Sequence, residues 1–526
     1  MTTLSRLAAG LREPPGREGS RKAIAGSDGS ILTVYSRSVR IEGSELYFVG
    51  REKEGKHLYI ATIEDGVDAG NEFRGRAVSL DILGSNLRGK RCPFAHENAE
   101  RLRQVFPFAR PVLIGREDSF GFGDRLGIAN PAHLRALEGS LMRPILAQQS
   151  VRELDRTERS AEDVLDAASW AVFQEGYTAG FGADADHLKT IDDIDRYARA
   201  GFTMFTFDPS AFVMNEAARL SENELRSRAR QAETGGVRLD DVLARYANRA
   251  FRLEDGTVLR PGTVDMIRAF VKYGGVLSHS LLLYRHLKHR HASLPSEVEI
   301  SVDETDTPTT PAEHLFVAGE LKRMGVEWVS LAPRFIGDFE KGVDYRGNLD
   351  AFSAEYLRHV GIANMMGPYK ISFHSGSDKF SVYRIVGRLG KGNVHVKTAG
   401  TSYLEALRTA AMVEPELVRE ILGFSIKRYA GERQSYHVSA QLDRVPRPEE
   451  CSGPQLINLF DQHDARQVFH VTFGKVLTAR DKQGNSLFRD RLMDCLDRNE
   501  DIHYATIIRH FRKHLEPFSH QRGETP

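Results

Sequence analysis

The stretch Tyr369–Phe380, YKISFHSGSDKF, decides the fold that we predict for this chain. Ile371 and Phe373 form the apolar core of a short strand, and His374 stands at its carboxyl end. The SGSDK turn at 375–379 then offers hydroxyls, backbone N–H groups and charges of both signs. Because parallel α/β proteins bind ligands at the carboxyl ends of their strands, this stretch predicts a buried strand that leads into a functional turn.

Similar apolar runs recur before and after this stretch. The eight candidate strands are PVLIG (111–115), PILAQ (144–148), YTAGFGA (177–183), FTMFTFD (202–208), VEISVDE (298–304), WVSLAP (328–333), YKISFH (369–374) and NVHVKT (393–398). Amphipathic stretches that end at glycine, such as 310–325 and 349–367, separate them as helices would. This alternation predicts a (β/α)8 barrel of the TIM type over residues 105–412, with a helical insertion at about 209–295. A doubly wound open sheet is the alternative fold.

Regions of a different pattern flank the predicted barrel. Residues 1–104 contain short alternating runs such as ILTVYS (31–36) and ELYFVGR (45–51), which predict a small N-terminal β-rich module. Residues 413–526 are mostly helical in pattern. We expect this C-terminal helical extension to pack on the barrel or to form the interface of a homo-oligomer.

The composition is typical of a globular protein that acts on a small molecule. Of 526 residues, 41% are hydrophobic and 27% are charged, and Lys plus Arg equal Asp plus Glu at 72 each. This balance gives no basic bias toward nucleic acid or anionic membranes. The three cysteines match no zinc or disulfide spacing, and no run of about 18 apolar residues occurs. We therefore expect reduced thiols, a cytoplasmic location, and neither a membrane nor a nucleic-acid partner.

Titratable side chains gather at the ends of four predicted strands. They are Asp186 and His187 after the third strand, Asp303 and Glu304 at the fifth, His374 at the seventh, and His395 and Lys397 in the eighth. Imidazole and carboxylate groups are ligands for several divalent metals, and a catalytic site holds its ion with about three of them. The pattern predicts one divalent ion, zinc, manganese, nickel or cobalt. Its ligands would be His187, His374 and His395, with Asp303 or Glu304 as a fourth.

The adjacent pair Asp186 and His187 suggests a division of labour. Neighbouring residues at a strand end point in different directions, so His187 can bind metal while Asp186 serves as an acid or base. The alternative is that Asp186 only caps the following turn. Asp303 and Glu304 leave the same choice open, because either carboxylate could face the site or the solvent.

Further polar residues near the strand ends are candidates for binding substrate. They are Asp124, Arg125, Gln148, Arg334, Ser375, Ser377, Asp378, Lys379 and Lys397. The glycine-rich SFGFGDRLG (119–127) matches no phosphate or dinucleotide fingerprint, so we expect no nucleotide cofactor. The histidines His437, His463 and His470 lie beyond the predicted barrel, and we expect His470 to be a packed helix residue.

Long runs of the chain resemble the tagaturonate/fructuronate epimerase family of hexuronate catabolism. They are SVDETDTPTTPAEHLF (301–316), LAPRFIGDFEKGVDY (331–345), GPYKISFHSGSDKFSVY (367–383) and NVHVKTAGTSYLEALR (393–408). The resemblance extends from about Gly115 through ARQVFHVTFG (465–474). It implies a metal-dependent isomerase that interconverts tagaturonate and fructuronate.

The two keto-uronates restrict the chemistry that such an enzyme could use. They differ at C4, which is β to the C2 ketone, so enolisation does not make the C4–H acidic. Two routes remain: transient oxidation at C4 by a nicotinamide, or retro-aldol cleavage of C3–C4, rotation of the aldehyde half and re-addition. The missing dinucleotide fingerprint and the candidate metal ligands favour the retro-aldol route. Asp186 and Glu304, with Asp303 as a substitute, would be its acid/base pair.

Two other functions fit the same residues. The protein could be a metal-dependent, class II-like aldolase that releases two fragments of a sugar acid, or a non-catalytic sugar-acid-binding barrel. Neutral ketohexoses such as fructose and tagatose are further candidate substrates. A cation that binds the substrate carboxylate would control that preference, and Lys379, Lys397 and Arg334 are equal candidates.

Overall fold

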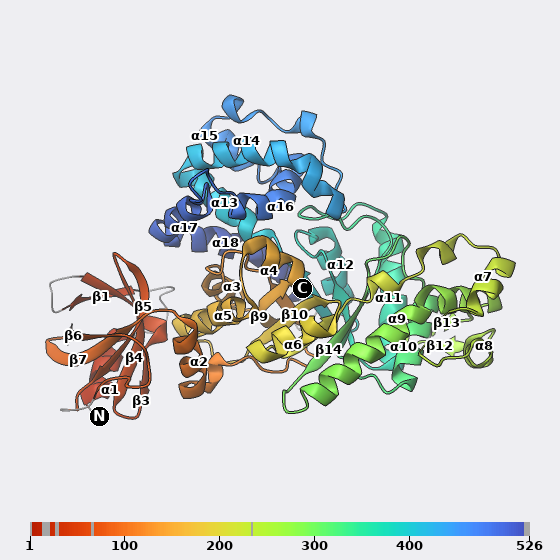
Figure 1. Cartoon of the computed structure of the whole chain (residues 1–526), viewed down its shortest axis with the longest axis horizontal. Helices are drawn as coiled ribbons and strands as arrows, with labels where there is room; N and C mark the ends of the chain where they lie inside the picture. The colour runs from red at the N-terminus through yellow and green to blue at the C-terminus, as the bar shows by residue number, and fades with distance from the viewer. Residues whose placement is uncertain (1–2, 13–20, 27–30, 65–67, 233–234, 520–526) are drawn as a thin grey trace. The chain divides into compact units, whose positions relative to one another are not determined.

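The computed structural model describes residues 3–12, 21–26, 31–64, 68–232 and 235–519 (Figure 1). They form two compact units. The first contains residues 1–111, 127–135 and 162–180, and the second contains 112–126, 136–161 and 181–526.

The first unit is built on a seven-stranded antiparallel sheet with the order β2-β1-β6-β7-β5-β4-β3. Its strands are β1 (Arg21–Gly26), β2 (Ile31–Tyr35), β3 (Arg40–Glu42), β4 (Glu45–Glu52), β5 (Gly55–Thr62), β6 (Arg76–Ile82) and β7 (Ser85–Cys92). The apolar side of α1 (Thr3–Leu11) joins one core, and α2 (His96–Val105) and α5 (Ala161–Glu175) join the other. The β-rich N-terminal module is thus confirmed.

The second unit contains a closed barrel of eight parallel strands in the order β10-β11-β14-β15-β16-β17-β8-β9. Its strands are β8 (Ser119–Phe122), β9 (Arg143–Ser150), β10 (Gly182–Leu188), β11 (Met204–Phe207), β14 (Glu297–Val302), β15 (Ser330–Pro333), β16 (Lys370–Phe373) and β17 (Val394–Thr398). The predicted barrel is confirmed, and closure excludes the open sheet.

Two predicted strands lie elsewhere than expected. PVLIG (111–115) is not a strand, and Val112 and Leu113 are 38% and 48% exposed. The first barrel strand is instead the glycine-rich β8, which is not among the eight predicted strands. A Cβ at Gly121 would lie 2.1 Å from Gln148 Oε1, so glycine here permits close packing inside the barrel. The third strand begins only at Gly182, which places Asp184 and Asp186 within it.

Helices follow the barrel strands as predicted. They are α4 (Val151–Thr157), α6 (Ile191–Ala200), α10 (Pro311–Arg323), α11 (Leu349–Met366), α12 (Phe380–Leu389) and α13 (Thr401–Val413). The insertion between β11 and β14 contains α7 (Glu222–Ala229), α8 (Leu239–Tyr246), the short hairpin β12 (Phe251–Arg252) and β13 (Val258–Leu259), and α9 (Thr263–Arg290). The remaining short helix, α3 (Asn130–Ala136), follows β8.

The C-terminal region is helical and packs on helices of the barrel. Its helices are α14 (Pro415–Glu432), α15 (Gly453–Asn458), α16 (His463–Thr478), α17 (Arg489–Arg498) and α18 (Glu500–Leu515), drawn in blue in Figure 1. Helix α16 packs against α4, and α18 packs against α13 and α12. None of the helices that the structure describes is long and apolar enough to cross a membrane.

Candidate active site

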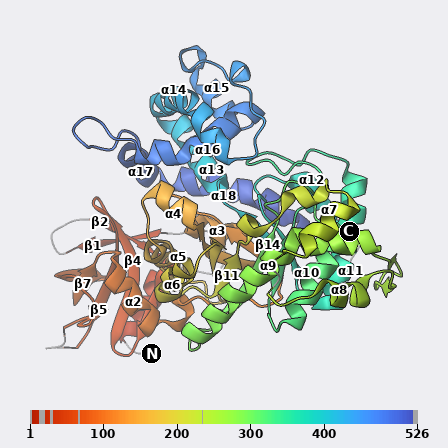
Figure 2. The same ribbon diagram turned by 45° about the vertical axis from the view of Figure 1, so that its right-hand side comes forward.

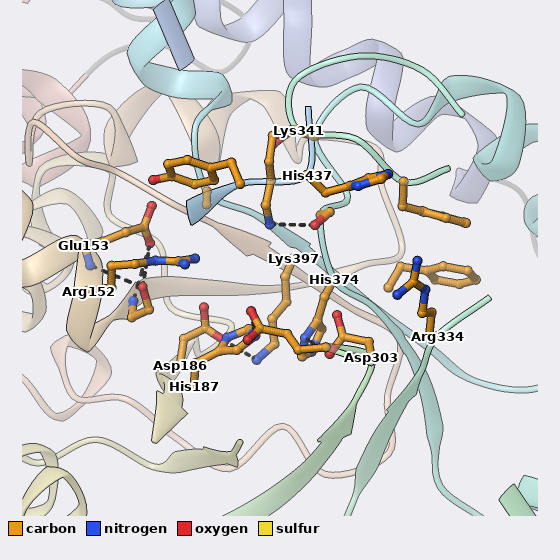
Figure 3. A pocket seen from close by; sticks show the side chains of 18 of the residues that line it. Arg152, Glu153, Asp186, His187, Asp303, Arg334, Lys341, His374, Lys397 and His437 are labelled. Atoms are coloured by element: carbon orange, nitrogen blue, oxygen red, sulfur yellow. Dashed lines mark hydrogen bonds and ion pairs between the residues drawn. The ribbon is translucent and has the colours of Figure 1, made fainter. Parts of the chain in front are cut away.

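A cavity of about 350 Å³ lies at the carboxyl ends of the barrel strands (Figure 3). Its walls come from the ends of β9, β10, β14, β15, β16 and β17 and from the C-terminal region. Eleven of the residues predicted for the site line it: Arg125, Gln148, Asp186, His187, Asp303, Glu304, Arg334, His374, Ser375, Ser377 and Lys397. The sequence-based prediction that the strand ends converge on one site is therefore supported by the geometry.

Lys397 binds three carboxylates at the base of this cavity. Its Nζ lies 2.7 Å from Asp184 Oδ2 and 2.8 Å from both Asp186 Oδ1 and Glu299 Oε1. Burial alone would lower the pKa of the ammonium, but the three carboxylates raise it well above its usual value. Lys397 is thus a charged group that orients Asp186, and its ammonium is already occupied by protein carboxylates.

Asp186 and His187 stand at an irregularity of β10. The pairing of β10 with β11 shifts between Ala185 and Leu188, and His187 adopts a left-handed backbone with φ of 56°. Bulges and such strained residues re-aim side chains and recur beside active sites. His187 Nδ1 lies 2.8 Å from Asp186 Oδ1, which leaves Nε2 for another partner. Burial would raise the pKa of Asp186, yet the charges of His187 and Lys397 hold it well below its usual range.

His374 lies between two carboxylates. Its Nε2 is 2.7 Å from Glu299 Oε1 and its Nδ1 is 3.1 Å from Asp303 Oδ1. Burial would lower the pKa of this imidazole, but Asp303 and Glu299 raise it to about 10. The Nδ1 contact lacks the direction of a hydrogen bond, so this buried nitrogen has no hydrogen-bond partner among the described residues.

The side chains of His187, Asp303 and His374 fit a divalent metal ion. Their ligand atoms all lie within 4.8 Å of one another. Two imidazoles and a carboxylate match the donors of zinc and related ions, and the buried Nδ1 of His374 makes only an ion pair with Asp303 and no hydrogen bond that an ion would have to displace. A second group, His187, Asp208 and Glu304, shares His187 with the first.

The structure does not bring His395 into this group. His395 is fully buried, and its Nδ1 lies 2.9 Å from Ser119 Oγ. In the parallel register His395 pairs with Ser372, two residues before His374, so it lies deeper in the barrel. Side chains two residues apart on a strand share a face, so His395 and Lys397 point to the same side of β17 as predicted. They lie at different depths in the barrel, one layer of side chains apart. The geometry therefore favours Asp303 over His395 as the third ligand.

Three of the predicted substrate residues do not line the cavity: Asp124, Asp378 and Lys379. The turn after β16 has left-handed residues at Ser375 and Asp378, which turn alternate side chains in different directions. Asp378 binds Arg466 of the C-terminal region at 2.6 Å, and the Nζ of Lys379 donates to the carbonyl of Glu340 at 2.7 Å. We interpret both as structural contacts.

Other residues that line the cavity escaped the sequence analysis. They include Arg152, Glu153, Lys341 and Tyr436, with Glu299 directly beneath. His437 and His470, which we expected to lie away from the site, also line it. A signal for Glu299 existed, because Glu299, Ser301 and Asp303 alternate with apolar residues along β14 and share its inner face. The others come from α4, from loops and from α16, where no local pattern marks them.

Positive side chains face the cavity opposite the carboxylates. Figure 3 shows Arg152 on one side, Arg334 on the other, and Lys341 across from the Asp186 and His374 group. No carboxylate of the described chain lies within ion-pair distance of Arg152 or Arg334, whereas Arg125 is paired with Glu153 at 3.0 Å. Burial lowers the pKa of Lys341, whose Nζ donates to Ser375 Oγ at 2.6 Å.

His470 is packed in α16, as predicted, but its side chain also lines the cavity, which the sequence did not predict. A Cβ at Gly400 would lie 2.2 Å from its Cε1, and one at Gly342 would lie 3.2 Å from its Nδ1. These glycines make a slot that holds the ring. Both ring nitrogens are buried without a hydrogen-bond partner in the described parts of the chain, and burial lowers the pKa of the ring well below its usual value.

Comparisons with known proteins agree with this architecture. The model of the tagaturonate epimerase family UxaE matches residues 35–518. A tagaturonate/fructuronate epimerase from Thermotoga maritima is 42% identical over 485 residues, which are 92% of this chain and 96% of that protein. The crystal structure of the fructuronate-tagaturonate epimerase UxaE from Cohnella laeviribosi matches with a TM-score of 0.85 and 36% identity, over 93% of this chain and 96% of its own. This chain therefore belongs to the tagaturonate epimerase family of isomerases.

Proposed function

We propose that this protein interconverts tagaturonate and fructuronate in the barrel cavity with the help of one divalent metal ion. The observation that carries the proposal is the group of Asp186, His187, Asp303 and His374. It shares a cavity of about 350 Å³ with two guanidinium groups, Arg152 and Arg334, that have no carboxylate partner in the described chain. Such a cavity offers metal ligands, an acid/base group and anion-binding cations together, as a metal-assisted reaction of a sugar acid requires.

His187, Asp303 and His374 would hold the metal ion, which we expect to be zinc, manganese, nickel or cobalt. When bound, such an ion acts as a Lewis acid that stabilises negative charge developing on a ketone oxygen. Glu299 Oε1 lies 2.7 Å from His374 Nε2, and Asp186 Oδ1 lies 2.8 Å from His187 Nδ1, so each carboxylate is within hydrogen-bond distance of one imidazole. These carboxylates would orient the two rings.

Arg152 and Arg334 would bind the carboxylate of the substrate. A guanidinium group binds a carboxylate in bidentate fashion, and these two have no protein carboxylate in the described chain to compete with the ligand. This arrangement supports uronates over neutral ketohexoses as substrates. Lys379 and Lys397, the other two candidates, are occupied by protein carbonyl and carboxylate groups.

Asp186 and Glu304 would move the proton of the C4 hydroxyl. In the retro-aldol route a base removes this proton, the C3–C4 bond breaks, and a three-carbon enediolate and a three-carbon aldehyde remain. The aldehyde half rotates, the bond forms again on its other face, and an acid returns the proton to the new hydroxyl. Asp186 is held ionised beside Lys397, whereas Glu304 is 40% exposed and lies 4.0 Å from His187 Nε2.

The C-terminal region would keep the two halves inside the cavity. Tyr436 and His470 line the wall formed by this region, and the unpartnered nitrogens of His470 offer hydrogen bonds to substrate hydroxyls. Retention of both halves distinguishes an epimerase from an aldolase, which releases them. This wall is therefore the feature that favours epimerisation over cleavage.

The proposal is tested by assaying purified protein with each keto-uronate after chelation and after addition of manganese, nickel, zinc or cobalt in turn. We expect activity to disappear on chelation and to return with at least one metal, without net release of three-carbon fragments. Activity that survives complete metal removal would contradict metal assistance and point to a bound nicotinamide. Accumulated three-carbon products would identify an aldolase, and binding without turnover would identify a sugar-acid sensor.

The compartment and the assembly remain predictions. The three cysteines, Cys92, Cys451 and Cys495, are buried and unpaired, which supports our proposal that the protein works in the reducing cytoplasm. A homo-oligomer built through the C-terminal helices would be detected by sedimentation or light scattering of the purified protein.

A further inference from the structure

Two histidines and an aspartate meet outside the cavity, where α6 lies beside α9 (Figure 2). His286 belongs to the last turns of α9, His291 is the residue that caps the carboxyl end of that helix, and Asp195 belongs to α6. The Nε2 atoms of His286 and His291 each lie 2.7 Å from the same oxygen, Asp195 Oδ1. Three potential metal ligands from two helices therefore converge on one point.

The convergence of three donor atoms sets this cluster apart from an ordinary ion pair. A carboxylate that only neutralises one imidazole needs a single partner, whereas Asp195 directs one oxygen at two rings. Without an ion, each Nε2–H donates a hydrogen bond to Asp195 Oδ1. A bound ion would replace these two hydrogens, and each ring would then keep its hydrogen on Nδ1. Two imidazole nitrogens and one carboxylate oxygen are a ligand set that zinc and neighbouring divalent transition metals accept.

The surroundings of the cluster leave room for a hydrated ion. The side chains of His286, His291 and Asp195 are 21%, 18% and 28% exposed, so water can complete the coordination. The carboxyl end of α9 adds the partial negative charge of a helix terminus. The nearby cation Lys288 is directed at the Ser296 carbonyl, to which its Nζ donates at 2.8 Å.

We propose that Asp195, His286 and His291 form a second divalent transition-metal site, separate from the ion in the barrel cavity. The bound metal links the insertion helix α9 to α6, a helix of the barrel. Helix α9 also contacts the loop after β10, because His279 Nε2 lies 2.9 Å from the carbonyl oxygen of Lys189. The second site therefore fixes the position of α9 close to the segment that carries Asp186 and His187, without contacting substrate.

The amount of zinc bound per chain tests the proposal directly. The full-length protein and its His286→Ala, His291→Ala and Asp195→Asn variants are dialysed against micromolar zinc sulfate, and bound zinc per chain is measured by mass spectrometry of the metal. His289→Ala is the matched control, because His289 is exposed on the same helix end but does not belong to the cluster. We expect each cluster variant to bind one zinc ion fewer than the wild type and the control. Equal zinc content in all five proteins would overturn the proposal.

Two further measurements separate this site from the cavity. The His374→Ala variant is expected to lose a different zinc ion, so the difference between His286→Ala and the wild type is independent of the proposed catalytic metal. Added zinc is expected to raise the melting temperature of His374→Ala but not that of a variant carrying both His374→Ala and His286→Ala. An identical response of these two proteins to zinc would contradict a metal at Asp195.

Discussion

Two groups of histidine and carboxylate in this protein have the same residue types but different surroundings. At the strand ends, His187, Asp303 and His374 face an open cavity and leave one imidazole nitrogen unsatisfied. In the turn after β16, Asp378 contacts His510 and His514 of α18 and forms an ion pair with Arg466 of α16.

The difference lies in which groups satisfy the donors. Asp378 Oδ2 lies 2.6 Å from Arg466 Nη2, its Oδ1 lies 2.5 Å from His510 Nε2, and its own backbone N–H donates to His514 Nε2 at 3.0 Å. Every ligand atom of that group has a protein partner, so the group joins the β16 turn to α16 and α18. The comparison teaches that residue type alone does not identify a metal site, because in the Asp378 group the Arg466 guanidinium already occupies the place that a cation would take.

The largest effect is expected from removing a ligand at the strand ends. His374→Ala should lose the catalytic metal and reduce epimerisation to background, because two ligands do not retain the ion. Metal analysis and the rate of fructuronate formation measure the two effects. If His374→Ala kept both metal and activity, the strand-end group would be no more a metal site than the Asp378 group is.

Asp186→Asn should reduce kcat by roughly 10²- to 10⁴-fold while metal content stays close to that of the wild type. The amide keeps the shape of the side chain but could not accept the C4 proton in the proposed reaction, and the proposed metal ligands are other residues. Steady-state kinetics and metal analysis of one preparation test this. Loss of the metal as well would show that Asp186 supports the ligand His187 in place of acting as a base.

Asp378→Asn should cost stability and leave the metal in place. The buried Arg466 guanidinium would lose its carboxylate, and breaking one side of a buried ion pair costs about 3–5 kcal/mol. Urea unfolding measures the loss, with metal content as the internal control. If the variant lost metal without losing stability, the Asp378 group would be a ligand site and the comparison would be reversed.

Arg334→Ala should have the smallest effect, seen mainly as a higher KM for the keto-uronates. A hydrogen bond to a charged group contributes about 1.5–3 kcal/mol, which corresponds to roughly 10- to 100-fold in affinity. Neutral tagatose or fructose, if turned over, provides the control because neither carries the carboxylate. Equal losses with charged and neutral substrates would assign Arg334 to structure, and Arg152→Ala would then be the next variant.

Local sequence patterns predicted most of the barrel strands but not the first one. Apolar runs that alternate with amphipathic helices predicted six of the eight strands near their observed places, because these runs are contiguous in sequence, and the third strand overlaps its prediction only at 182–183. The first strand is Ser119–Phe122, and its glycine is required by Gln148 on the neighbouring strand. A glycine required by a partner far away in sequence leaves no periodic signal, so the local pattern predicts the strand at PVLIG (111–115) instead.

The sequence by itself determined the fold class, the family, and the convergence of Asp186, His187, Asp303, His374 and Lys397 on one rim. Those features depend on polar residues in or just after the carboxyl ends of apolar strands, which can be read locally. Only the tertiary structure decided the depth and the partners of each group. His395 lies a layer below the rim, because parallel register pairs it with Ser372. His470 reaches the cavity because helix packing, which acts between distant segments, carries α16 to the barrel.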